Sequence, residues 1–202
     1  MKTKAYKTGI IGISSVVILI LSILVIGNAN EEFSFTEDFI SKLGTQGQPN
    51  ALWYNIFGFG IVGILQMAFG YLYGRILNDK WVSVLLSLFG LGFALTAIPT
   101  DIDLPNSPLS KAHILAICLG LASWLFGLSR LGYSPKINKG TKQQGNVTAI
   151  LLVLSMVGFT IGLWSMPITH RLVFGIVFGW TALTSYELIR SSFTTQDLNS
   201  KL

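Results

Sequence analysis

The sequence predicts an all-α membrane protein: a polytopic bundle of six transmembrane helices with both termini in the cytoplasm. Of its 202 residues 51% are hydrophobic and 11% are charged, which is too apolar for a soluble domain. Six apolar stretches approach the length of about 20 residues needed to cross a hydrocarbon core of about 30 Å. Basic residues gather in the loops on one side of these stretches.

The predicted spans are residues 8–27, 53–73, 81–99, 112–132, 147–166 and 170–190. They use nearly the whole chain, so we expect one membrane domain over residues 1–202. Short connections make consecutive helices antiparallel neighbours, and only residues 167–169 separate the last two spans. Small residues recur at helical spacing in the third span, a pattern typical of close helix packing in lipid. The members of this stripe are Ser83, Ser87, Gly90, Ala94 and Ala97.

The basic residues fix the predicted orientation. Eleven of them fall in cytoplasmic segments if the N-terminus is inside: Lys2, Lys4, Lys7, Arg75, Lys80, Arg130, Lys136, Lys139, Lys142, Arg190 and Lys201. Only Lys42, Lys111 and Arg171 fall outside. This is the positive-inside pattern of a protein in the cell membrane (inner or plasma membrane), so the net charge of +5 reports orientation and nucleic acid is not an expected partner.

Two features of the first and fourth spans complete the topology. Three lysines before an apolar run also resemble a signal peptide, but the run from Thr8 to Gly27 is long for one. Cleavage would leave five spans in the same orientation. Cys118, the one cysteine, lies inside the fourth span, which excludes an intrachain disulfide and a cysteine-rich metal site.

Residues 28–52 form the longest loop, on the outer side. A short interfacial helix over residues 36–43 would bury Phe39, Ile40 and Leu43 against the lipid headgroups. Glycines at 44 and 47 and a proline at 49 would then turn the chain into the second span. We expect this loop to lie over the mouth of the bundle.

Polar residues mark the outer ends of three helices. Asn50, Ser110 and Thr169 are the expected N-caps of spans two, four and six. Just inside them follow Asn55, His113 and His170, each at the head of a stripe that continues down its helix. Polar groups within a span usually face the bundle interior, so the sequence predicts one polar site that opens outward.

Two chemistries are open for this site. Helix N-termini and the cation of Arg171 favour an anionic ligand. Alternatively, Asp101 and Asp103 could bind zinc together with His113 and His170. Plainer interpretations are interfacial histidines bonded to backbone carbonyls and solvated loop acids.

Several of these residues resemble the signature of the domain-of-unknown-function 998 family of prokaryotic six-span membrane proteins. The resemblance covers essentially the whole chain and rests on three short segments: SKLGTQGQP at 41–49 with WYN at 53–55, PTD at 99–101, and HRL at 170–172. It implies an architecture and shared positions, but no activity. Asp103 departs from the family's pattern, which weakens it as a metal ligand.

Three functions follow, and the cofactor is unknown. The first is binding of a lipid or small anionic ligand at the outer face, with Ser41, Asn55 and Arg171 as contacts. The second is an enzyme, a hydrolase or transferase acting on lipid or headgroup substrates, in which Asp101, His113 and His170 exchange protons or hold a metal. The third is a structural or accessory membrane protein whose outer loop docks a partner.

Overall fold

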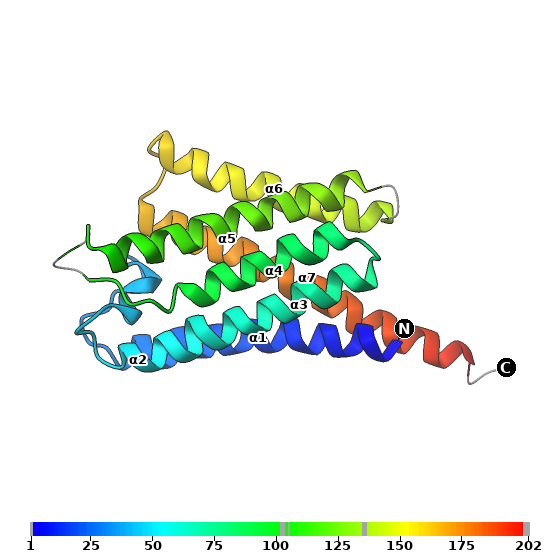
Figure 1. Cartoon of the computed structure of the whole chain (residues 1–202), viewed down its shortest axis with the longest axis horizontal. Coiled ribbons are helices and arrows are strands. Elements are labelled where there is room, and N and C mark those ends of the chain that lie inside the picture. The colour runs from blue at the N-terminus through cyan, green and yellow to red at the C-terminus, as the bar shows by residue number, and fades with distance from the viewer. Residues whose placement is uncertain (1, 102–103, 105, 135–136, 200–202) are drawn as a thin grey trace.

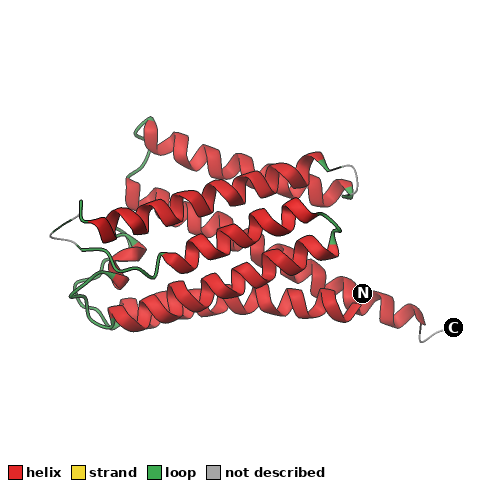
Figure 2. Cartoon of the chain, in the orientation of Figure 1, coloured by secondary structure: helices red, strands yellow, loops and turns green. Residues whose placement is uncertain are grey.

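In the computed structural model, the described residues, which are all except 1, 102–103, 105, 135–136 and 200–202, form helices joined by loops and contain no strand (Figure 2). Six long helices alternate with short connections. They are α1 (Lys2–Asn28), the continuous run α2 (Ala51–Tyr54), η2 (Asn55–Ile61) and α3 (Val62–Ile76), then α4 (Lys80–Leu95), α5 (Pro108–Tyr133), α6 (Lys139–Thr160) and α7 (Met166–Asn199). A 3-10 helix, η1 (Ile40–Gly44), lies in the loop between α1 and α2. The all-α prediction is confirmed.

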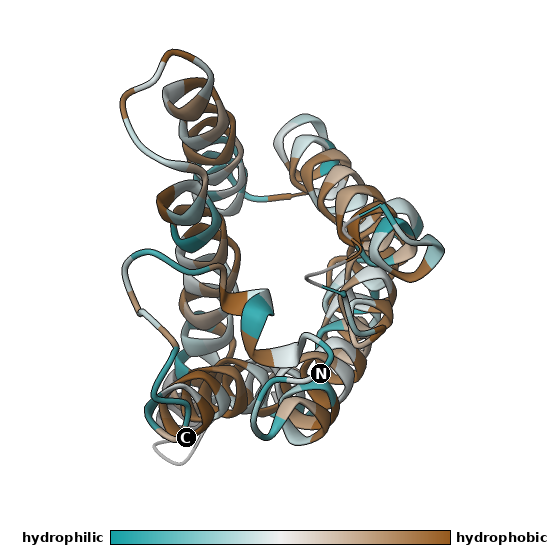
Figure 3. Cartoon of the chain, turned by 90° about the vertical axis from the view of Figure 1, so that its left-hand side faces the viewer, coloured by the Kyte–Doolittle hydropathy of each residue, from teal (hydrophilic) through white to brown (hydrophobic). Residues whose placement is uncertain are grey.

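The helices form a ring in which each packs against its neighbours in the chain and α7 returns to α1 (Figures 1 and 3). Both termini lie at one end of this bundle, which we call the termini end. The loop between α1 and α2 lies at the opposite end, the loop end (Figure 1). The continuous run from α2 to α3 begins at the loop end, as do α5 and α7, while α4 and α6 begin at the termini end.

Four helical segments are long and apolar enough to cross a membrane: Thr3–Asn28, Ala51–Ile76, Pro108–Tyr133 and Met166–Phe193. Helix α4 is apolar but only 16 residues long. Helix α6 opens on the polar sequence KGTKQQGN before its apolar part begins. Among the described residues, four helices therefore have the length and composition of membrane spans, as expected of a membrane protein.

Side-chain caps explain where several helices begin. Asp79 caps α4 by accepting from the N–H groups of Trp81 and Val82, and Ser107 caps α5 by accepting from that of Ser110. Ser110 is thus not the N-cap that we predicted. The cap moves to Ser107 because Pro108, at the first helical position, needs no hydrogen-bond partner for its nitrogen. Asn50 does precede α2, but in the left-handed conformation and without a side-chain cap.

The connection between α6 and α7 differs from the prediction. Helix α6 ends at Thr160, and the last turn closes through hydrogen bonds from the Gly162 N–H to Phe159 O (3.0 Å) and from the Leu163 N–H to Gly158 O (2.8 Å). Gly162 adopts φ +77°, the left-handed conformation that ends helices at glycine. The link is therefore residues 161–165, and Thr169 lies inside α7 instead of capping it.

The predicted interfacial helix over 36–43 is replaced by η1, which begins four residues later. Ile40 and Leu43 are buried as expected, but in the protein interior, whereas Phe39 is 41% exposed. Ser34 and Asp38 explain the delayed start, because the Asp38 carboxylate accepts from the Ser34 N–H at 2.8 Å and the Ser34 hydroxyl accepts from the Glu37 N–H at 3.2 Å. These local bonds hold residues 34–38 in turns.

Helices α3 and α4 approach most closely, as the small-residue stripe predicts. Glycines at 63, 70 and 74 of α3 face Ala94, Leu86 and Ser83 of α4, and Gly90 faces the α3 backbone at Met67. A Cβ atom built on Gly70 would lie 2.6 Å from the carbonyl carbon of Leu86. Gly175 and Gly179 of α7, by contrast, have nothing within 4 Å of such an atom.

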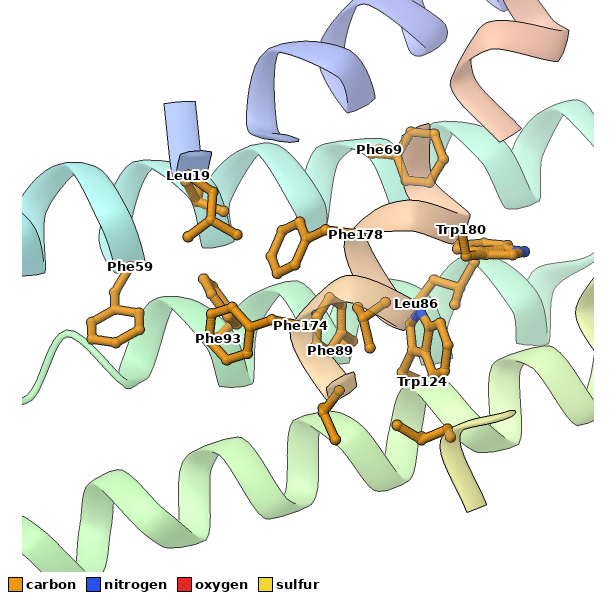
Figure 4. Packing of buried hydrophobic residues seen from close by; sticks show 14 of the residues in the cluster. Leu19, Phe59, Phe69, Leu86, Phe89, Phe93, Trp124, Phe174, Phe178 and Trp180 are labelled. Atoms are coloured by element: carbon orange, nitrogen blue, oxygen red, sulfur yellow. The ribbon is translucent and has the colours of Figure 1, made fainter. Parts of the chain in front are cut away.

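Aromatic side chains fill the interior of the ring (Figure 4). Phe93 of α4 contacts Phe59, Phe89, Phe174 and Phe178 with ring centroids 5.2–5.9 Å apart. Further toward the termini end, Trp124 and Trp180 meet edge to face at 5.8 Å. These aromatic side chains come from α4, α5, α7 and η2. Their contacts therefore connect helices on different sides of the helix ring.

Candidate ligand cavity

A cavity of about 410 Å³ lies between α4, α5, α6 and α7, near the loop end. Most of its wall is apolar, made by aromatic rings of α4 and α7 and aliphatic side chains of α5 and α7. Six lining residues carry a hydroxyl, an imidazole or a thiol: Ser41, Thr100, His113, Cys118, Thr169 and His170. The structure therefore brings Ser41 and both histidines to one apolar cavity.

His113 is held in place by the end of α4. Its Nδ1 lies 2.9 Å from the carbonyl oxygen of Ile98, in the turn where the chain leaves α4, and its ring meets the edge of Phe59. A ring nitrogen that faces a carbonyl oxygen carries the proton, so in the neutral imidazole Nε2 keeps the lone pair. The residue is only 7% exposed, so this ring has a fixed orientation at the cavity wall.

His170 stands between two aromatic rings. Its centroid lies 4.7 Å from that of Phe174, one turn along α7, and 5.7 Å from that of Phe39 in the loop. Its Nδ1 is buried without a hydrogen-bond partner among the described residues. An unpaired buried polar atom costs about 1–3 kcal/mol, which marks this imidazole as a group that would gain from a ligand.

Asn55 lies outside the cavity lining, although its stripe predicts a place beside the histidines. Its Nδ2 donates to the carbonyl of Gly44 at 2.8 Å, and its Oδ1 is buried without a partner in the described part of the chain. A Cβ atom on residue 44 would collide with that amide. Asn55 thus ties η1 to the top of the α2–α3 helix, where the π-helical turns of η2 begin.

Arg171 also points away from the cavity, toward the loop. Its Nε donates to Phe35 O at 2.6 Å, Nη2 to Asp38 O at 2.6 Å and to Ser34 O at 3.4 Å, and Nη1 to Pro167 O at 2.7 Å. Burial raises the pKa of the Asp38 carboxyl, but hydrogen bonds from Lys42 and the Ser34 N–H and the charges of Lys42 and Arg171 outweigh it, so the net pKa lies below its usual value. Four hydrogen bonds therefore tie the guanidinium to backbone carbonyls, three of them in the loop.

The loop is fastened at a third point, to the connection between α4 and α5. The Gln46 N–H donates to Thr100 O at 2.9 Å, and the hydroxyls of Thr45 and Thr100 lie 2.9 Å apart. Together with Asn55 and Arg171, these bonds place Ser41 and Phe39 over the cavity. The local sequence does not predict these contacts of Thr100, because its partners lie about 55 residues away.

Asp101 organises a turn. Its Oδ1 accepts from the Leu104 N–H at 3.2 Å, and its own N–H donates to the Ser110 hydroxyl at 3.1 Å. Asp103 lies outside the described residues. Within the described part, no three His, Cys, Asp or Glu side chains come close enough together to hold a metal ion, so Asp101 does not join the two histidines in such a group.

Sequence reasoning missed the aromatic part of the wall. Phe174 and Phe178 follow His170 at i+4 and i+8, and Phe89 and Phe93 are four apart on α4, so helical spacing carried the signal. Our prediction used the stripe that follows His170 at i+7 and i+11, which leads to Val177 and Thr181. Thr181 lies deeper, where it contacts Gln66, and that amide also donates to Ser15 of α1 at 3.0 Å.

Comparison with known proteins identifies one family. Its model, described as a protein of unknown function (DUF998), matches residues 13–188. No curated protein matches the chain. No solved structure matches it either.

Proposed function

Because the chain belongs to the DUF998 family, whose function is unknown, we propose its function from the cavity and from the placement of charge. The protein is a six-span component of the cell membrane that binds an amphipathic, lipid-like ligand from its extracytoplasmic side. The apolar part of the ligand occupies the aromatic cavity, and its hydrogen-bonding head lies against His113, His170 and Ser41.

The directions of the helices support six spans. The α2–α3 run, α5 and α7 each contain a segment of spanning character, and all three begin at the loop end (Figure 1). A chain that leaves α3 at the termini end must return to the loop end before α5 can begin, and α4 makes that return. Helix α6 does the same between α5 and α7. At a rise of 1.5 Å per residue, α4 and α6 are about 24 and 33 Å long, close to the thickness of a hydrocarbon core.

The excess of basic residues at the termini end supports a cytoplasmic location for that end. In a Cys118→Ala background, Asn106→Cys at the loop end should react with an impermeant maleimide added to intact cells. Lys139→Cys at the start of α6 should react only after the membrane is permeabilised. Labelling of residue 139 in intact cells would indicate the opposite orientation, in which the cavity opens toward the cytoplasmic side.

The observation that carries the ligand proposal is the combination of two imidazoles with a mostly apolar wall. The cavity volume of about 410 Å³ falls within the range of about 300–1,000 Å³ typical of small-molecule pockets. The Nε2 lone pair of His113 suits a donor such as a hydroxyl, and the buried Nδ1 of His170 needs a partner. Ile114, Met156 and Met166 line the cavity and are themselves exposed, so the opening faces the acyl chains of the bilayer.

Cys118 offers a direct test, because it lines the cavity, is exposed, and is the one cysteine of the chain. We expect monoolein, a single-chain lipid with a hydroxyl head, to slow modification of Cys118 by N-ethylmaleimide about tenfold or more in detergent-purified protein. His170→Phe keeps the ring but removes its nitrogens. It should raise the protecting monoolein concentration about fivefold, since one hydrogen bond contributes about 1 kcal/mol.

Tyr133→Phe, at the far end of α5, is the matched control. Monoolein should protect Cys118 in this variant as well as it does in the natural chain. Absence of protection at saturating monoolein would rule out a lipid-like ligand in this cavity. Equal protection of Cys118 in the control and in the double variant His113→Phe/His170→Phe would show that the imidazoles do not bind the polar head of the ligand.

A second candidate is a hydrolase or transferase acting on such a lipid. It is favoured by one observation: a serine hydroxyl and two imidazoles line the same cavity, and these are the groups of nucleophilic and general-base catalysis. An enzyme would release oleate from monoolein and lose that activity in Ser41→Ala, while Cys118 protection persists. A binding protein would show protection without release of oleate.

A further inference from the structure

A second surface feature lies far from the cavity, on the outward face of the α3–α4 pair at the termini end. It is a furrow of about 600 Å³ that runs along the seam between the two helices. Its rims are exposed apolar side chains, among them Met67 and Tyr71 of α3 and Leu88 and Leu91 of α4.

Close helix packing makes the furrow. Gly74, Ser83 and Ser87 form its floor, because the two backbones come together there and leave no room for larger side chains. Both hydroxyls are already used: Ser83 donates to Tyr71 O at 2.8 Å, and Ser87 to Ser83 O at 2.7 Å. The floor therefore presents no unmet hydrogen bonds and is compatible with a hydrocarbon chain.

The furrow ends in positive charge. Arg75 and Lys80 line its termini end and are exposed, and neither cationic group has an ion-pair partner among the described residues. The nearby Asp79 does not cancel them. Its Oδ1 accepts from the Trp81 and Val82 N–H groups, and its Oδ2 accepts from Arg130 Nε at 3.0 Å.

We infer that this furrow binds one anionic phospholipid, with an acyl chain along the seam and the phosphate between Arg75 and Lys80. From Met67 to Asn78 the furrow extends about 17 Å at 1.5 Å per residue, close to half of a hydrocarbon core of about 30 Å. It therefore matches the depth of a single leaflet. Basic residues at such a depth attract anionic headgroups. This site is separate from the cavity and does not depend on the ligand proposed there.

Native mass spectrometry of the delipidated protein can test the site. After each lipid is added back, we expect one phosphatidylglycerol to be retained per chain and phosphatidylcholine of the same chain length to be lost. Inorganic phosphate should not displace the lipid, because the acyl chain provides much of the binding. Arg75→Gln/Lys80→Gln should raise the half-saturating concentration at least about tenfold, since each surface cation contributes about fivefold.

Two further variants sharpen the test. Lys139→Gln/Lys142→Gln removes the same charge at the same end of the bundle but outside the furrow, and it should bind like the natural chain. Val84→Trp fills the furrow from its exposed rim without touching the cations and should also weaken binding. Equal retention of both lipids, equal binding by the Arg75/Lys80 variant and its control, or displacement by phosphate would each overturn the inference, as would a second copy of the chain occupying the seam.

Discussion

Replacing Arg171 by alanine should release the loop at residues 30–46 while leaving the helices folded. The guanidinium donates to three loop carbonyls, at Ser34, Phe35 and Asp38, and to Pro167 of its own helix. Each hydrogen bond to a charged group contributes about 1.5–3 kcal/mol when buried, but part of this cluster is exposed to solvent. We therefore expect a local loss of about 3 kcal/mol.

Amide hydrogen exchange measures that loss directly. A change of about 3 kcal/mol corresponds to exchange about a hundredfold faster at the loop amides, such as those of Lys42 and Gln46. Lys42→Ala is the matched control. It removes an ion pair with Asp38 (2.8 Å) and an exposed hydrogen bond to Glu32 O (3.0 Å), which together contribute about 1 kcal/mol, so exchange should rise no more than about fivefold.

The result also separates two roles for Arg171. If the residue positions the loop, Arg171→Ala should weaken monoolein protection of Cys118 through Ser41 and Phe39, and Arg171→Lys should restore only part of it. If the arginine bound an anionic ligand instead, the loop amides would exchange at the natural rate and only anion binding would be lost. Unchanged exchange would thus contradict the positioning role.

Arg171 shows why the sequence could bring residues to one end of the bundle but could not predict the contacts of each. A cation next to His170 at a helix start is equally consistent with an anion and with a row of backbone carbonyls. The choice depends on which carbonyls of the loop lack partners, and those belong to turns more than 130 residues away. Asn55 presents the same problem, because its partner, Gly44, is set by the path of the loop.

The histidines were predictable for the opposite reason. Each occupies an early turn of a long helix, and the stripe that follows His113 at i+7 and i+11, Gly120 and Trp124, is buried in the structure and marks the face that turns inward. That prediction needs only the period of one helix. The end of α6 was not predictable from hydropathy, because Ile161 and Leu163 continue the apolar run beyond it. Gly162 alone marks the break, and its left-handed conformation makes the turn.

Several residues with uncommon backbone conformations lie at the loop end, next to the cavity. Asn50 and Gly47 have positive φ, η2 is π-helical, and the Oδ1 of Asn55 has no hydrogen-bond partner among the described residues. Single π-helical turns are frequent at functional sites, and left-handed residues let a chain turn sharply. The turns at Asn50 and Gly47 and the bond from Asn55 to Gly44 keep the loop over the bundle, where Phe39 and Ser41 complete the cavity wall.

The seam between α3 and α4 should be the most sensitive packing contact in the bundle. A Cβ atom on Gly90 would lie 2.7 Å from the carbonyl carbon of Gln66 and would also meet the backbone of Met67. Backbone atoms cannot rotate aside as a side chain can, so the helices must separate. We expect Gly90→Ala to lower the free energy of unfolding by about 3 kcal/mol, at the upper end of overpacking costs.

Gly179→Ala is the matched control, because it makes the same change in α7 where nothing lies within 4 Å. It should leave stability unchanged or raise it by up to about 1 kcal/mol through helix propensity. Thermal unfolding of both variants in one detergent provides the comparison. Gly70→Ala meets the same seam through Leu86, so its cost and that of Gly90→Ala should not add, since the first already separates the helices. Equal stability of Gly90→Ala and Gly179→Ala would mean that α3 and α4 lie farther apart, and the furrow between them would lose its floor.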